Sequence, residues 1–219
     1  MIRSVGKSLL VAGVGLGLAS GASAQSDGRG ASFGVLGGAT FSTIKGSDVA
    51  AQNLTTRTSF AAGAFVQLGI SRNFAIEPQL LYIIKGAKGS QPGVEFGARL
   101  SYVEVPVLAT VKFPAGTSSG PVLFLQAGPA LAVKVDCELT GSAGGTMISS
   151  KCQDITPDPV QIKSTDLSFI VGAGVDVRRA RIMARYELGL SKIDDSSAGS
   201  NAKNRSLVVL VGWTIKSPR

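Results

Sequence analysis

The residues of this chain that could do chemistry are carboxylates and cations, because the sequence contains no histidine. Without an imidazole, neither a Ser-His-Asp nor a Cys-His arrangement can form, and most hydrolases are built on one of these. Charged residues recur instead at alternate positions of apolar segments: Glu77, Glu104, Asp176, Glu187, Lys85, Lys112, Arg181 and Arg185. We therefore expect no enzymatic activity, no catalytic residue and no cofactor.

The two cysteines, Cys137 and Cys152, fall in the longest polar stretch of the chain. A metal site is not expected, since there is no histidine and no CxxC pair. In an oxidising compartment, an even pair at this spacing indicates a disulfide bond, with two free thiols as the alternative. Closing a loop of about 15 residues stabilises a fold by roughly 3 kcal/mol in the chain-entropy model.

The segments that carry the charges alternate between apolar and polar or small side chains, which predicts β-strands. In the last one, the residues from Leu207 to Ile215 place five large apolar side chains on one face. Most of these runs are about 10 to 15 residues long, whereas strands of soluble proteins mostly have 5 or 6. Ten residues tilted by about 40° rise about 25 Å, the height of the lipid-facing band of a membrane barrel. The eight runs are 33–42, 58–70, 74–86, 99–113, 121–135, 167–177, 182–190 and 206–216.

The connections between these runs alternate between long and short along the whole chain. Outer-membrane barrels have long loops outside and short turns on the periplasmic side. With a periplasmic N-terminus, all the long connections are external, and the fifth, which holds both cysteines, is the longest. The predicted fold class is all-β: an eight-stranded, antiparallel, up-and-down transmembrane β-barrel over residues 33–216.

The first residues follow the order of a secretory signal peptide. A basic head with Arg3 and Lys7 precedes the apolar run 9–19, and Ala22-Ser23-Ala24 offers a cleavage site. The apolar run has about 11 residues, fewer than the about 20 that a spanning helix needs. We expect residues 1–24 to be a signal peptide and 25–32 a short lead. Export then places the protein in the outer membrane of a Gram-negative bacterium.

The inside of an eight-stranded barrel is only wide enough for side chains to fill. Charges there must be paired, because an isolated buried charge has a large desolvation cost. We expect Glu104 to pair with an interior cation such as Arg185 or Arg181. A narrow conducting path and a carboxylate-based active site are the alternatives. The predicted polar network of the lumen comprises Glu77, Glu104, Asp176, Arg181, Arg185 and Glu187.

Several segments resemble the PorT-like outer membrane β-barrel family. They are Phe33-Gly34-Val35-Leu36-Gly37-Gly38, Glu77-Pro78-Gln79-Leu80-Leu81-Tyr82 with Lys85-Gly86-Ala87-Lys88, Tyr102-Val103-Glu104-Val105-Pro106-Val107-Leu108, Ala127-Gly128-Pro129, and Arg185-Tyr186-Glu187-Leu188-Gly189-Leu190. The resemblance implies an eight-stranded barrel in a family whose members largely have no assigned activity. Members usually end on an aromatic residue, whereas this chain continues past Trp213 to Arg219.

Two classes of function fit these expectations. The leading one is a structural or surface-interaction barrel whose external loops meet an unknown protein or ligand while its outer face contacts outer-membrane lipid. The alternative is a small porin-like pore or a ligand-carrying transport barrel. Conductance measured in planar bilayers would distinguish this alternative from the leading class. A soluble periplasmic barrel similar to lipocalins is a third reading, which membrane fractionation tests. The net charge of +8 comes from scattered basic residues with few aromatics between them, so nucleic acid is not an expected partner.

Overall fold

The computed structural model describes residues 30–45, 55–91, 94–115, 120–143, 146–154, 163–191 and 202–216. The predicted signal peptide, and residues 25–29 of the predicted lead, lie outside these ranges. In the described part of the chain, no helix is both long enough and apolar enough to cross a membrane.

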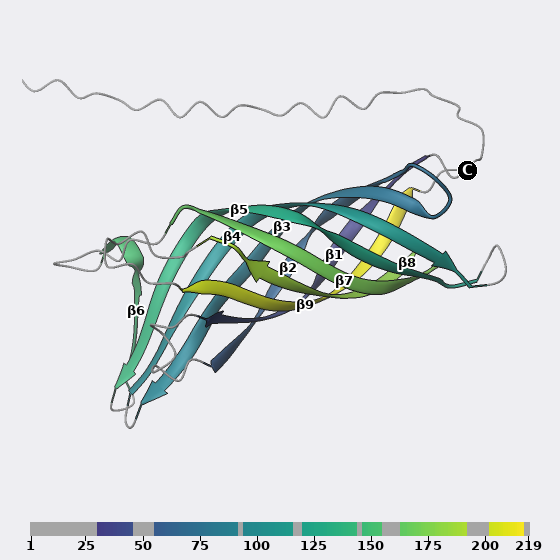
Figure 1. Ribbon diagram of the computed structural model, residues 1–219. Coiled ribbons are helices and arrows are strands. Elements are labelled where there is room, and N and C mark those ends of the chain that lie inside the picture. Colours follow the sequence, from purple (N-terminus) through teal and green to yellow (C-terminus); the bar gives the residue numbers. More distant parts are fainter. Residues whose placement is uncertain are drawn as a thin grey trace, which may run out of the picture.

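Eight strands close into a ring in the order β1-β2-β3-β4-β5-β7-β8-β9, and β9 pairs back onto β1 (Figure 1). Every strand pairing is antiparallel, and β6 lies outside the ring, paired with β5 alone. The predicted eight-stranded antiparallel barrel is therefore confirmed, with one additional strand. The bounds are β1 Ala31–Lys45, β2 Thr55–Gly69, β3 Phe74–Gln91, β4 Val94–Pro114, β5 Val122–Ala143, β6 Thr146–Lys151, β7 Thr165–Val177, β8 Ala180–Gly189 and β9 Lys203–Lys216.

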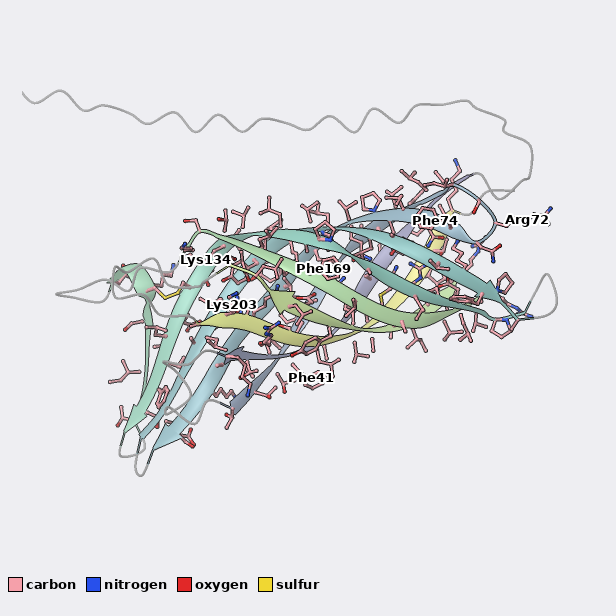
Figure 2. All side chains as sticks on the ribbon, in the orientation of Figure 1. Phe41, Arg72, Phe74, Lys134, Phe169 and Lys203 are labelled. Atoms are coloured by element: carbon pink, nitrogen blue, oxygen red, sulfur yellow. A yellow bond between two sulfur atoms is a disulfide. The ribbon has the colours of Figure 1, made fainter. Side chains whose placement is uncertain are left out.

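Alternation decides which side chains face outward. Along β9, Val208 and Leu210 are fully buried, while their neighbours Val209, Val211 and Trp213 are exposed. Figure 2 shows side chains such as Phe41 and Phe169 on the outer surface of the barrel. Large apolar side chains cover that surface on all eight ring strands. An apolar outer surface around a closed ring suits lipid, because closure leaves the ring without an unpaired strand edge.

The two ends of the barrel differ. The turn end, on the right in Figure 1, holds the connections 70–73 and 178–179, the end of β4 and the start of β5, together with the start of β1 and the end of β9. The loop end holds the opposite ends of the strands. Strand β1 begins at Ala31, so residues 31 and 32 of the predicted lead are part of the barrel.

The loop predicted over residues 87–98 is wrong. Strands β3 and β4 stay paired without a shift from Leu81 and Glu104 to Gln91 and Val94, and only two residues separate them. The ladder continues because the backbone groups that face each other across β3 and β4 pair with one another up to the turn. Strand β5 likewise continues to Ala143. These strand ends and β6 project beyond the loop end at the lower left of Figure 1, and we call residues 86–99, 136–143 and 146–154 the extension.

The disulfide between Cys137 and Cys152 is confirmed. Its setting differs from the predicted loop, because Cys137 lies in β5 and Cys152 begins a single 3₁₀ turn after β6. Both cysteines are buried in one cluster with Leu100. The bond therefore links the residue that follows β6 back to β5, next to the barrel.

Near the loop end, the pairing of β3 with β2 is interrupted and then resumes, and β1 contacts β3 at the interruption. The β2–β3 register shifts between Thr56 and Ala61. Buried hydroxyls of β1 replace the missing ladder bonds, since Thr40 donates to the carbonyl of Ile84 at 2.8 Å and Ser42 donates to that of Gly86 at 3.0 Å. Gly86 has a φ of 139°, a conformation that glycine adopts without strain. The extension begins at this distortion.

Candidate functional site

Four charged side chains form a buried cluster midway through the lumen. Lys85 Nζ of β3 lies 2.6 Å from Glu104 Oε2 of β4 and 3.0 Å from Glu187 Oε2 of β8. Arg185 Nη2 of β8 lies 2.9 Å from Glu187 Oε1 and 3.4 Å from Glu104 Oε1. None of the four side chains is more than 2% exposed. Two cations and two carboxylates balance, so the cluster is neutral.

A second cluster lies nearer the turn end. Arg181 Nη1 is 2.6 Å from Glu77 Oε2, and its Nε is 2.6 Å from Asp176 Oδ1. The guanidinium carbon of Arg181 lies 4.8 Å from the ring centre of Phe65 and 4.7 Å from that of Phe124. Cation–π contacts of this kind strengthen when the site is dry. Arg181 is thus held by two carboxylates and packed between two rings.

Glutamine side chains connect the two clusters. Gln79 accepts from Arg185 Nη1 at 2.8 Å and donates to Glu77 Oε1 at 2.8 Å. Gln67 also donates to Glu77, at 2.7 Å, and accepts from Lys112. Gln126 donates to both Glu77 and Thr110. The result is one continuous polar network along the lumen axis.

All six residues predicted for the lumen network lie in these two clusters. Glu104 contacts Lys85 and Arg185, whereas Arg181, the other partner considered for it, binds Glu77 and Asp176 instead. Lys85 and the three glutamines were not in the predicted network. The signal for the glutamines was available, because they occupy alternate positions of the same strands as the charges. The pairing itself depends on register, which one sequence does not reveal.

At the loop end, a third polar group is buried in the lumen. Asp166 of β7 is 4% exposed. It accepts a hydrogen bond from Asn204 Nδ2 at 2.8 Å and another from the Ser191 hydroxyl at 2.7 Å. These residues join the ends of β7, β8 and β9. Polar side chains therefore occur along the interior from the turn end to the loop end, among buried apolar ones such as Phe65 and Leu81.

Outside the lumen, the extension bears a groove of about 410 Å³. Thr55 and Arg57 of β2 and Thr140 of β5 belong to its walls. Behind it, Arg99 Nη1 lies 3.4 Å from Glu138 Oε2. The Ser149 hydroxyl donates a short hydrogen bond to Glu138, and this bond and the cation beside it hold the pKa of that carboxyl below its usual range. In the described ranges, no group of cysteine, aspartate or glutamate side chains is arranged to hold a metal ion.

Three solved structures of outer-membrane proteins show similarity to this chain. Ail, the attachment invasion locus protein of Yersinia pestis, is 13% identical, with 85% of this chain and 99% of that chain covered and a TM-score of 0.42. Neisserial surface protein A is 16% identical, with 85% and 100% covered and a TM-score of 0.45. The N-terminal β-barrel domain of Pseudomonas aeruginosa OprF is 13% identical, with 83% and 97% covered and a TM-score of 0.35. No curated protein sequence matches.

The family is shown by sequence. The model of the outer membrane protein beta-barrel domain matches residues 23–195. The narrower resemblance to PorT-like proteins stays a prediction. With that match over most of its length, and with a closed ring of eight strands, the chain belongs to the outer membrane β-barrel domain family.

Proposed function

We propose that this protein is a non-enzymatic barrel of a Gram-negative outer membrane that acts by presenting its loop end to the surroundings. In this proposal the lumen is a packed polar core and conducts no solute. The observation that carries it is the buried ion-pair network, which joins strands from opposite sides of the ring. Lys85 and Glu104 come from β3 and β4, and Arg185 and Glu187 come from β8.

The burial of these charges argues against an open path. A water-filled channel would hydrate the charges that line it, yet Glu104, Glu187, Lys85 and Arg185 are all nearly inaccessible to water. Large side chains fill the space around them, among them Tyr102, Phe65, Phe124 and Leu81. An eight-stranded barrel has just enough room for such a filling. Opening it would strip each charge of its partner, which is costly in a dry interior.

The loop end supplies the surface for interaction. Strands β3, β4 and β5 have 18, 21 and 22 residues, whereas β7 and β8 have 13 and 10. Because of the additional length, β3, β4 and β5 extend as a sheet beyond the apolar outer surface. The disulfide stabilises this extension. Binding residues are commonly carried by such segments on a rigid scaffold. We place the loop end outside the cell and the turn end in the periplasm.

Two measurements test this function. The protein should sediment with outer membranes and resist extraction by carbonate, and recovery in the soluble periplasmic fraction would contradict the location. For orientation, one epitope tag is inserted in the turn between β3 and β4, and a matched tag in the turn between β2 and β3. An antibody added to intact cells should bind only the first. Binding of the second tag alone would reverse the assigned orientation.

A further inference from the structure

The groove of the extension differs from the lumen in the state of its arginine. The Nε atoms of Arg57 and of Arg185 in the lumen are both buried without a hydrogen-bond partner, but the Arg185 guanidinium is held by two carboxylates. In the described part of the chain, no carboxylate forms a salt bridge with Arg57, whereas each fully buried lumen cation lies within 3.0 Å of one. The carboxylate that acts on Arg57 at longer range, Glu138, is already engaged by Arg99 and Ser149.

An anion would remove this imbalance. Burial and the like charge of Arg99 both lower the pKa of Arg57, which is the direction expected of a guanidinium without a counterion. Lys88, an exposed cation, lines the same groove. Among the described lining residues, Glu95 is the one carboxylate, and it is exposed. Two cations against one carboxylate leave the lining with a net positive charge.

The rest of the groove is lined by hydroxyl groups, by glycines and by the ring of Phe96. Thr55, Ser90, Thr140 and Ser142 contribute hydroxyl groups. Thr55 donates to the Lys88 carbonyl at 3.2 Å and Thr140 to the Gly97 carbonyl at 3.4 Å, so their oxygens remain able to accept. At Gly97, an added Cβ would lie 2.9 Å from Thr140 Oγ1 and 3.5 Å from Arg57 Nη1. Glycine thus leaves room beside the guanidinium.

We propose that this groove binds an acidic sugar, with its carboxylate or phosphate on Arg57 and Lys88 and its hydroxyls on the threonines and serines. Arginine binds carboxylate and phosphate through paired N–H groups. A volume of about 410 Å³ falls in the range of small-molecule pockets, about 300 to 1,000 Å³. This proposal adds a ligand class to the surface role proposed above. It rests on that role, because a sugar reaches the groove only if the loop end faces the surroundings.

The test is a titration of the full-length barrel in detergent micelles, followed by calorimetry or by amide shifts of the extension. The probes are glucuronate, glucose 1-phosphate, glucose and inorganic phosphate. We expect both acidic sugars to bind at least about tenfold more tightly than glucose or phosphate. Arg57→Gln should weaken acidic-sugar binding by at least about tenfold, and Arg57→Lys by less. Glu95→Gln should tighten it, since a like charge is removed.

The matched control is Arg72→Gln, because Arg72 is exposed at the turn end (Figure 2). It should leave binding unchanged. The proposal is overturned if no acidic sugar binds, if Arg57→Gln and Arg72→Gln behave alike, or if Glu95→Gln weakens binding. Equal affinity for inorganic phosphate and glucose 1-phosphate would overturn the sugar assignment. Detergent micelles have no sidedness, so none of these outcomes depends on membrane orientation or conductance, and failure of the surface role is detected separately.

A second arm identifies the source of the sugar. The barrel is reconstituted in bilayers with lipopolysaccharide and in bilayers of phospholipid alone, and both are titrated with glucuronate. Weaker apparent binding beside lipopolysaccharide would support the proposal with the membrane's own sugars as ligands. Equal binding in both bilayers would support it with a ligand from the surroundings.

Discussion

The lumen and the groove are formed by strands of the same sheet, but the arginine of the lumen is paired with carboxylates and the arginine of the groove is not. In the lumen, Arg185 lies between Glu104 and Glu187 at 3.4 and 2.9 Å and accordingly needs no further counterion. In the groove, Arg57 is half-buried. Among the neighbouring charges, the one with the largest effect on its pKa is another arginine, Arg99. In the proposed function, these compensated charges are part of a packed lumen. The uncompensated charge of Arg57 lies on β2 at the loop-end edge of the ring, where Arg57 still pairs with Ser42 of β1 and lines the groove.

The difference has a physical cause. Inside the ring, a charge without a partner has no water to replace the lost interaction, so folding selects neutral clusters. At the loop-end edge of the ring, partial hydration tolerates a charge imbalance that binding can later relieve. Arginine therefore has a structural role at position 185, whereas at position 57 it can bind an anionic ligand.

The largest expected effect comes from a matched pair of substitutions on β4. Glu104→Gln leaves Lys85 and Arg185 with one carboxylate between them, and breaking one side of a buried pair costs about 3–5 kcal/mol. Glu95→Gln removes an exposed charge from the extension and should change stability by about 0.5 kcal/mol or less. Denaturant unfolding of both variants in lipid vesicles makes the comparison. Equal, small effects would show that Glu104 is not a paired core residue.

Removing the disulfide should act on the extension alone. The double variant Cys137→Ser/Cys152→Ser loses a closure of about 15 residues, which is worth roughly 3 kcal/mol in the chain-entropy model. We expect faster hydrogen exchange in Thr146–Lys151 and unchanged exchange in Ala180–Gly189, because opening is local. Peptide-resolved mass spectrometry measures both segments. Equal acceleration in the two would mean that the extension and the barrel open as one unit.

Two glycines sharpen the comparison of packing. A Cβ on Gly38, in the barrel, would lie 1.9 Å from the Val209 carbonyl oxygen, whereas one on Gly141, in the extension, would meet nothing within 4 Å. Gly38→Ala should therefore destabilise the barrel by about 1–3 kcal/mol through overpacking. Gly141→Ala should change its stability by less than about 0.5 kcal/mol. If the two unfolding midpoints move equally, strand packing is no tighter in the barrel.

The smallest effect concerns Glu138. Its lowered pKa means that its charge contributes to stability above the ordinary carboxyl range and that this contribution is lost as the pH falls through the lowered value. Ser149→Ala removes the first cause of the shift. The pKa of Glu138 should then rise toward its usual value, with almost no change in unfolding. Side-chain carboxyl NMR across the acidic range reports it, and an unmoved pKa would assign the shift to Arg99.

The sequence predicts the barrel and the disulfide well because strict physical rules govern both. Lipid on one side and a packed lumen on the other impose alternation, as β9 shows from Leu207 to Ile215. The extension follows no such rule, and small residues such as Gly86, Gly89 and Gly97 break the pattern that identifies a strand. The network shows the same limit. Alternation places Glu104 and Arg185 inside, but only register, across 81 residues of sequence, makes them partners.

Conductance in planar bilayers tests the central claim, a lumen closed by compensated charge, most directly. Purified wild-type barrel, shown to be inserted and folded, should pass no steady current, because side chains occupy the space between Arg181 and Lys85. Glu104→Gln is the variant for comparison. Because this substitution loosens the charge network, the variant should show at most brief openings. A steady, voltage-proportional current through the wild-type protein would contradict the account and favour a pore.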